Sequence, residues 1–210
     1  MNKTNLIRLS EHFTLAELCK TSHTTATGNT PPPAAINNLK NLCDNWLEPL
    51  RHSYNTRYGD PDEPLIISSG YRSPEVNRKA GGSPTSNHTT GCAVDIRCLG
   101  LEQAIRYAAI LLDLADTRGR EFKGAQVSEG TRVSEGCQVS EGSQLEGSQA
   151  PVASQASEGT PCSVAPQVPE GTLGPDFDEL FIERSSRGTY WLHLAVRPTA
   201  NRHKTAFVQT

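Results

Sequence analysis

The chain has no long apolar run, no excess of basic charge and no secretory signal. No stretch approaches the roughly 18 consecutive apolar residues of a membrane span, and residues 1–9 lack the apolar core of a signal peptide. A formal net charge of -3 and a pI near 6.1 give no electrostatic basis for binding nucleic acid. We therefore expect a protein made in the cytoplasm, with no membrane span and no nucleic-acid partner.

The six cysteines form no CxxC pair and no regular framework. Four of them, Cys19, Cys43, Cys92 and Cys98, lie within predicted helices or strands. This placement favours buried free thiols over a disulfide scaffold or a thiolate metal site.

What the chain does contain is a histidine and an aspartate seven residues apart, His88 and Asp95, and a further histidine, His193, near its end. Two histidines and one carboxylate are ligands that a catalytic zinc takes from a protein, with a fourth position open for water. Asp95 lies in an apolar stretch, where an unpaired carboxylate is costly and needs a cation, hydrogen bonds or a metal. The pattern favours a zinc hydrolase. The other four histidines lack such a setting and are interpreted as surface residues: His12, His23, His52 and His203.

Strand geometry supports this grouping. If residues 92–98 form a strand, alternation places Asp95 on one face and the larger apolar side chains on the other. The same alternation in residues 190–196 places His193 opposite an apolar core face. A glycine turn at Gly91 would let the preceding histidine fold back over the first strand.

The run from Ser68 to Asp95 resembles the zinc D-alanyl-D-alanine carboxypeptidase family, whose fold is shared with the hedgehog signalling domain. The opening SEHFTLAEL at residues 10–18, SGYRS at 69–73 and WLH at 191–193 are also similar, so the resemblance spans residues 10 to about 115 and 176–198. The family pattern SxHxxGxAxD is met by Ser86, His88, Gly91, Ala93 and Asp95.

The resemblance implies one zinc per chain, held by His88, Asp95 and His193. It also implies that Arg72 holds a carboxylate of the peptide substrate, with Ser86 as a nearby hydrogen-bonding group. A guanidinium fork suits a carboxylate and stays charged at any working pH. The alternative for Arg72 is a solvated side chain at the end of a strand.

One position departs from the family pattern. The best-known members have an acidic general base three residues before the last histidine, where this chain has Tyr190, a poor base at neutral pH. The nearest acid is Glu183, in a predicted hairpin strand. If Glu183 pairs opposite Trp191, it shares the metal-facing side of the sheet with His193, as in phage-lysin-like relatives. A one-residue slip would instead turn Glu183 to the surface.

The helices are predicted from caps and apolar spacing. Thr14 and Glu17 form a capping box for a helix at residues 15–20. A second helix follows residues 31–33, with Pro49 kinking or tightening its last turn, and a strand is expected at residues 65–68. A third helix, from residue 101 to about 117, is expected to turn one apolar stripe to the core: Leu101, Ile105, Ala108, Leu112 and Ala115.

Residues 124–174 have a different composition. The unit VSEG begins at residues 127, 133 and 139 and is followed by degenerate copies. A six-residue period can indicate a β-helix, but three clean copies with so little apolar content cannot bury a core. A wall-binding repeat would need aromatic or basic residues. We expect a disordered surface insertion within a single domain that spans residues 1–210.

These observations predict an α+β fold in which a small antiparallel sheet, backed by helices, carries the zinc site. The predicted function is zinc-dependent hydrolysis of peptide bonds in peptidoglycan stem peptides, by a monomer acting on the cell wall, as a D-alanine-type carboxypeptidase or a phage endolysin. The alternative is a non-catalytic phage structural or wall-binding module that retains the zinc site. The sequence leaves open phage or bacterial origin and terminal or internal cleavage.

Overall fold

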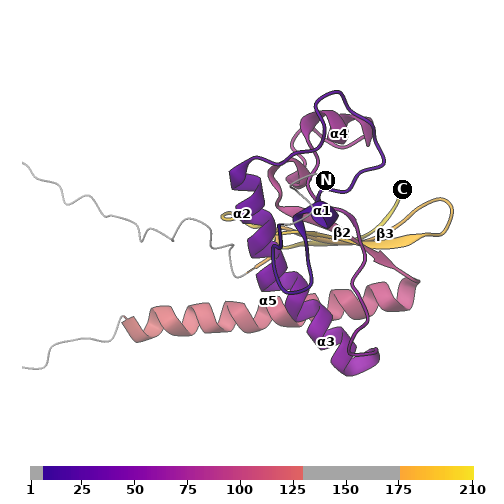
Figure 1. The fold of residues 1–210 in the computed structure, drawn as a ribbon. Helices are drawn as coiled ribbons and strands as arrows, with labels where there is room; N and C mark the ends of the chain where they lie inside the picture. The colour runs from indigo at the N-terminus through magenta and orange to yellow at the C-terminus, as the bar shows by residue number, and fades with distance from the viewer. Residues whose placement is uncertain (1–6, 130–175) are drawn as a thin grey trace, which may run out of the picture.

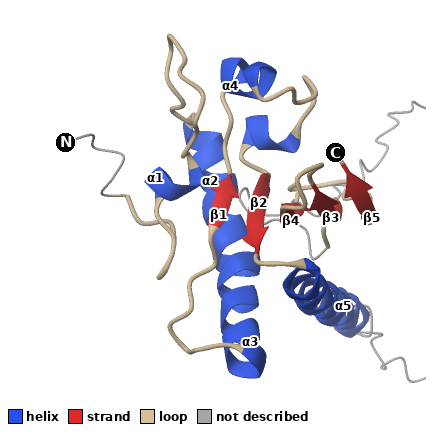
Figure 2. Ribbon diagram, turned by 90° about the vertical axis from the view of Figure 1, so that its right-hand side faces the viewer, coloured by secondary structure: helices blue, strands red, loops and turns tan. Residues whose placement is uncertain are grey.

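Five strands form one sheet in the order β1-β2-β4-β3-β5, and alternating apolar and polar residues build its central strands β2 and β4. The computed structural model describes residues 7–129 and 176–210 of the 210-residue chain. The expected α+β class is confirmed, and Figure 2 shows the strands side by side with the helices around them. The strands are β1 (Ile67–Ser69), β2 (Ala93–Cys98), β3 (Glu179–Arg184), β4 (Tyr190–Ala195) and β5 (Lys204–Gln209).

The pairing differs in one respect from the expected antiparallel sheet. β1, β2, β4 and β3 pair antiparallel in that spatial order, but β5 pairs parallel to β3. Strand β5 was not predicted, because its residues are almost all exposed and carry no apolar alternation. Its parallel direction follows from the crossover of residues 196–203, which returns the chain to the start of β3.

One face of the sheet forms the core and the other carries the candidate site. Val94 and Ile96 of β2 and Leu192 and Leu194 of β4 are fully buried. Asp95 alternates with the β2 core residues and therefore projects from the opposite face. The predicted strand faces are confirmed.

The first helix is short because the chain turns directly after it. In α1 (Leu15–Leu18), the Oγ1 of Thr14 accepts a hydrogen bond from the Glu17 amide at 3.3 Å, as the capping box predicts. The helix ends two residues earlier than expected. The Leu18 carbonyl then accepts a hydrogen bond from the Tyr71 amide at 2.7 Å, which ties α1 to the chain leaving β1.

The second helical region continues beyond Pro49, contrary to the expectation that this proline lies in the last turn. It comprises α2 (Pro33–Leu42), the π-helical segment η2 (Cys43–Leu47) and α3 (Glu48–Tyr58). Proline has no amide hydrogen to donate to the carbonyl four residues earlier, that of Asn45. That carbonyl instead accepts a hydrogen bond from Arg118. The helix therefore continues through the wider π-helical turn of η2 and does not end at the proline.

The third predicted helix is α5 (Leu101–Glu129), which continues past its expected end near residue 117 and through residues 124–129, expected to be the start of the disordered insertion. Ala108 and Ala115 of the expected core stripe do pack on the core, but its three larger residues were wrong. Leu101, Ile105 and Leu112 are 39%, 51% and 40% exposed. The buried side chains are Ala104, Tyr107, Ile110, Leu111 and Ala115. Apolar residues occur all around this helix, so their spacing did not select a face. The contact of Tyr107 with Tyr54 of α3, with ring centroids 4.6 Å apart, fixes its rotation.

Two short helices lie near the site face of the sheet. These are α4 (Pro74–Lys79) and the 3₁₀ helix η3 (Asn87–Thr90). Figure 1 shows α4 and α5 on opposite sides of the sheet. Cys43, Cys92 and Cys98 are buried free thiols, as predicted, whereas the free thiol of Cys19 is only half-buried. In the described part of the chain no helix is long and apolar enough to cross a membrane.

Candidate metal centre

Two adjacent strands bring the predicted ligands together. β2 and β4 pair antiparallel in a register that places Asp95 directly opposite His193. Residues directly opposite in an antiparallel pair have their side chains on the same face, a few ångströms apart. A separation of 98 residues in sequence thus becomes a direct contact.

The third side chain arrives through a turn that requires glycine. His88 lies in η3, which ends at Gly91 with φ +73. A Cβ at position 91 would also lie 2.5 Å from the backbone oxygen of Ala35 in α2. The left-handed turn therefore lets η3 pack against α2 while His88 folds back over β2, as the sequence predicted.

The three side chains form a buried cluster whose possible ligand atoms all lie within 4.8 Å of one another. Oδ1 of Asp95 lies 2.9 Å from Nδ1 of His193 and 3.3 Å from Nε2 of His88. His88, Asp95 and His193 are 3%, 7% and 9% exposed. Within the described residues this is the one such group of three.

The outward-facing nitrogen of each histidine also faces an acceptor. Nδ1 of His88 lies 2.7 Å from the Gly70 carbonyl oxygen, which leaves Nε2 directed into the cluster. Nε2 of His193 lies 3.5 Å from Oε2 of Glu179, which leaves Nδ1 directed into the cluster. Acceptors behind the histidines are a regular feature of protein metal sites, because they fix ring orientation and tautomer.

The electrostatics of the cluster favour binding a cation. Burial opposes ionisation of Asp95, but His88 and His193 hold its pKa far below its usual range. Burial likewise opposes protonation of His193, but the carboxylates of Asp95 and Glu179 raise its pKa to about 9. Two imidazole nitrogens and one carboxylate oxygen match the donor set of a catalytic zinc site, so these residues fit the implied metal.

A cavity of about 540 Å³ opens over the cluster and contains the remaining predicted site residues. Arg72 donates to Oδ2 of Asp95 at 2.6 Å and to the hydroxyl of Ser69 at 2.8 Å. Its side chain is 19% exposed, so part of the guanidinium faces the cavity. Ser86 also lines the cavity, and its hydroxyl accepts the His88 amide at 3.4 Å as the N-cap of η3.

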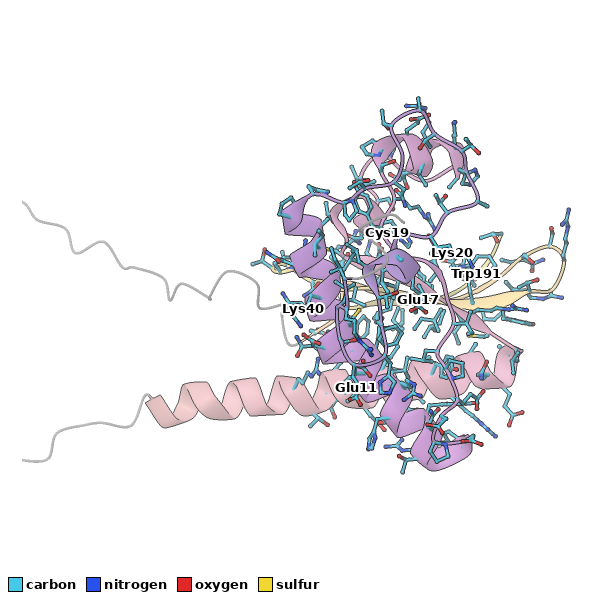
Figure 3. The ribbon with its side chains drawn as sticks, viewed as in Figure 1. Glu11, Glu17, Cys19, Lys20, Lys40 and Trp191 are labelled. Atoms are coloured by element: carbon cyan, nitrogen blue, oxygen red, sulfur yellow. The ribbon has the colours of Figure 1, made fainter. Side chains whose placement is uncertain are left out.

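The hairpin register of β3 and β4 is the one the sequence analysis selected. Glu183 pairs opposite Trp191, and Phe181 pairs opposite His193. Glu183 and Trp191 both line the cavity, and Figure 3 labels Trp191 on the sheet. Burial raises the pKa of the Glu183 carboxyl, although His193 opposes the shift.

Tyr190 lies away from this cavity. It pairs opposite Arg184 and Cys98, and it packs against the hydrophobic core on the other face of the sheet. The residue that departs from the family pattern therefore contributes to packing.

The charged residues behind His193 were not predicted from the sequence. Asp178 is fully buried and binds Arg202, while Glu179 contacts Arg202, Asn87 and His193. Glu179 could have been found, because alternation places it on the same face as Glu183. Arg202 could not, because its position depends on the crossover into the unpredicted strand β5.

The comparison with known families decides the identity of the domain. A family model described as Peptidase M15 matches residues 11–123, which is more than half of the chain. The chain belongs to the peptidase M15 family. The resemblance drawn from the SxHxxGxAxD pattern is thereby confirmed, and membership supports a metallopeptidase of a zinc-dependent family. A search of curated proteins finds no match. The matched region includes His88 and Asp95, whereas His193 and Glu183 lie beyond it.

Proposed function

We propose that this M15 peptidase hydrolyses peptide bonds in peptidoglycan stem peptides, with D-alanine-containing ends as the leading substrate. It would act on the cell wall, as a monomer, in the manner of a D-alanine-type carboxypeptidase or an endolysin. One observation carries the proposal. His88, Asp95 and His193 converge beneath a cavity that also contains the carboxylate of Glu183 and the guanidinium of Arg72.

The proposed metal is one zinc per chain, held by Nε2 of His88, a carboxylate oxygen of Asp95 and Nδ1 of His193. When bound, zinc supplies a Lewis acid that polarises the scissile carbonyl and lowers the pKa of the attacking water toward about 7. The protein's contribution is a buried site with two oriented imidazoles.

Glu183 is the proposed general base. Its carboxylate accepts a proton from the attacking water and returns it to the nitrogen of the leaving amine. Burial raises its pKa, which makes its carboxylate a stronger base toward that water. Glu179 is less suited to this role, since hydrogen bonding to His193 and the charge of Arg202 lower its pKa.

Arg72 is the proposed site for a carboxylate of the substrate. It lies in the wall of the cavity beside Asp95, where its remaining donors can hold a free peptide terminus. Such a contact would set the distance between the substrate terminus and the scissile bond. Ser86 borders the same cavity and is proposed as an additional hydrogen-bonding group.

The second candidate function is a phage structural or wall-binding module that retains the metal site without a working base. Tyr190 at the family's base position was the feature that favoured it. The placement of Tyr190 against the core, with Glu183 in the cavity, supports the enzyme instead.

The test is mass spectrometry of muropeptides incubated with the zinc-loaded protein, its Glu183→Gln variant and its Tyr190→Phe variant. Loss of a positioned acid–base group should lower the rate of the glutamine variant at least about 10²-fold. Zinc content should be unchanged, because Glu183 is not a proposed ligand. The phenylalanine variant should remain active. Absence of stem-peptide cleavage by the wild type would favour the binding module, and loss of turnover in Tyr190→Phe alone would overturn the assignment of the base.

A further inference from the structure

We infer that Glu179 is the positioning residue for His193, and that Arg202, from the crossover between β4 and β5, holds Glu179 in place. The inference rests on the proposed function, since it takes His193 to be a metal ligand. Arg202 lies outside residues 176–198, where the family resemblance ends, and outside residues 11–123, which the family model matches.

The two nitrogens of His193 face two different carboxylates. Nδ1 lies 2.9 Å from Oδ1 of Asp95, inside the cluster. Nε2 lies 3.5 Å from Oε2 of Glu179, on the outer side. The hydrogen bond made by one imidazole nitrogen determines which nitrogen is free to bind a metal. A carboxylate at Nε2 therefore directs the lone pair of Nδ1 toward the metal position and increases the basicity of the ring.

Glu179 is itself held from two sides. Nη2 of Arg202 donates to its Oε1 at 2.5 Å, and Nδ2 of Asn87 donates to its Oε2 at 3.2 Å. Asn87 directly precedes His88. The Glu179 carboxylate therefore contacts both His193 and the segment that carries His88. Charge-assisted hydrogen bonds of this kind are short and directional, which limits the positions that the carboxylate can adopt.

Arg202 is fixed in turn by a buried acid. Asp178 is 0% exposed and accepts Nε of Arg202 at 2.8 Å, Nη2 at 2.6 Å and the Arg202 backbone amide at 3.0 Å. A buried carboxylate is costly unless it is paired, so this geometry is strongly determined. The planar fork of arginine spans both oxygens of Asp178 and still reaches Glu179, which the single point of a lysine ammonium would not.

The chain offers a matched control for a merely structural role. Arg197 belongs to the same crossover and binds the same carboxylate, with Nη2 2.8 Å from Oδ1 of Asp178. The Arg197 guanidinium donates a hydrogen bond to the Ala200 carbonyl, whereas the Arg202 guanidinium donates one to Glu179. Removing Arg197 weakens the anchoring of the crossover, whereas removing Arg202 also releases Glu179.

The experiment is a zinc competition titration with a chromophoric chelator on the full chain and its variants. It is run at about pH 9, where protons compete less with the metal for imidazole than at neutral pH. Glu179→Gln should weaken zinc binding about 10- to 100-fold, the scale seen when a carboxylate behind a metal-binding histidine is removed. Arg202→Ala should weaken it in the same direction, Arg202→Lys should recover part of the loss, and Arg197→Ala should leave it unchanged.

The outcomes separate this inference from the proposed function. Unchanged zinc affinity in Glu179→Gln, with tight binding by the wild type, would overturn the inference and leave the peptidase proposal standing. A wild type that binds no zinc would overturn both. Equal losses in Arg197→Ala and Arg202→Ala would assign the network to stability alone. Circular dichroism of the metal-free variants checks folding, and Glu179→Asp provides a second variant that keeps the charge.

Discussion

Glu179 and Glu183 lie on the same face of one strand, yet their surroundings give them opposite properties. Each is two residues from Phe181, whose ring stacks on His193 with centroids 5.8 Å apart. Burial raises the pKa of Glu183, whereas the hydrogen bond to His193 and the charge of Arg202 lower the pKa of Glu179. Two carboxyl groups whose pKa values are shifted in opposite directions suit different roles, here those of the proposed base and the proposed positioning residue.

The raised pKa of His193 predicts a pH-dependent zinc affinity. In the metal-free protein the carboxylates of Asp95 and Glu179 raise this pKa to about 9, so zinc must displace a proton at neutral pH. As the pH falls below about 9, the protonated fraction grows and the apparent affinity should fall about tenfold per pH unit, down to about pH 7. Competition titrations in several buffers measure the slope, and an affinity that stayed constant from about pH 7 to 9 would contradict the prediction.

At the scale of elements, the link from η3 to β2 is where backbone geometry determines the site. Gly91 adopts a left-handed conformation against α2, and it separates His88 from the strand that carries Asp95. The same φ with a side chain would cost free energy by itself, and contact with the Ala35 carbonyl would add to that cost.

Gly91→Ala should therefore lower the free energy of unfolding by about 2 kcal/mol or more and weaken zinc binding by displacing His88. Gly28 provides the matched control, since it has φ +74 but no atom within 4 Å of the position that an added methyl group would occupy. Gly28→Ala should show only the conformational cost, about 1–2 kcal/mol. Urea unfolding of the metal-free proteins measures both, and equal losses would show that the contact with Ala35 is unimportant.

For the whole molecule, the proposed domain organisation is a single peptidase domain with a low-complexity insertion at residues 124–174. Most of that insertion lies outside the described residues, between α5 and β3. Asp95 and His193 pair directly across two strands although the insertion separates them in sequence. The segment after the insertion, which carries His193 and Glu183, is thus positioned by sheet pairing within the described residues.

Replacing residues 126–170 with a short Gly/Ser linker should leave the fold, the zinc content and peptide cleavage intact. The cost of closing a loop changes slowly with its length, so shortening it has little effect on stability if the insertion does not pack on the domain. Thermal unfolding, metal analysis and the muropeptide assay check the three properties. A shortened chain that was insoluble or had lost zinc would show that the insertion contributes to the folded domain.

The sequence by itself determined the features that depend on local spacing. Strand alternation placed Asp95 and His193 on faces opposite the core, and the resemblance to the family pattern SxHxxGxAxD singled out His88 with its glycine turn. Alternation also made Glu183 a candidate once its partner in the hairpin was chosen. These features follow from the two-residue period of a strand and the conformational freedom of glycine, which neighbouring residues reveal.

Tertiary structure alone decided the rest. The buried face of α5 depends on Tyr107 meeting Tyr54, because apolar residues surround that helix and no spacing distinguishes a core side. The parallel strand β5 has no apolar alternation, and it forms because the crossover returns beside β3. Arg202 reaches Glu179 only through that crossover. Such contacts join residues far apart in sequence or on different elements, so their energies depend on packing that no local pattern records.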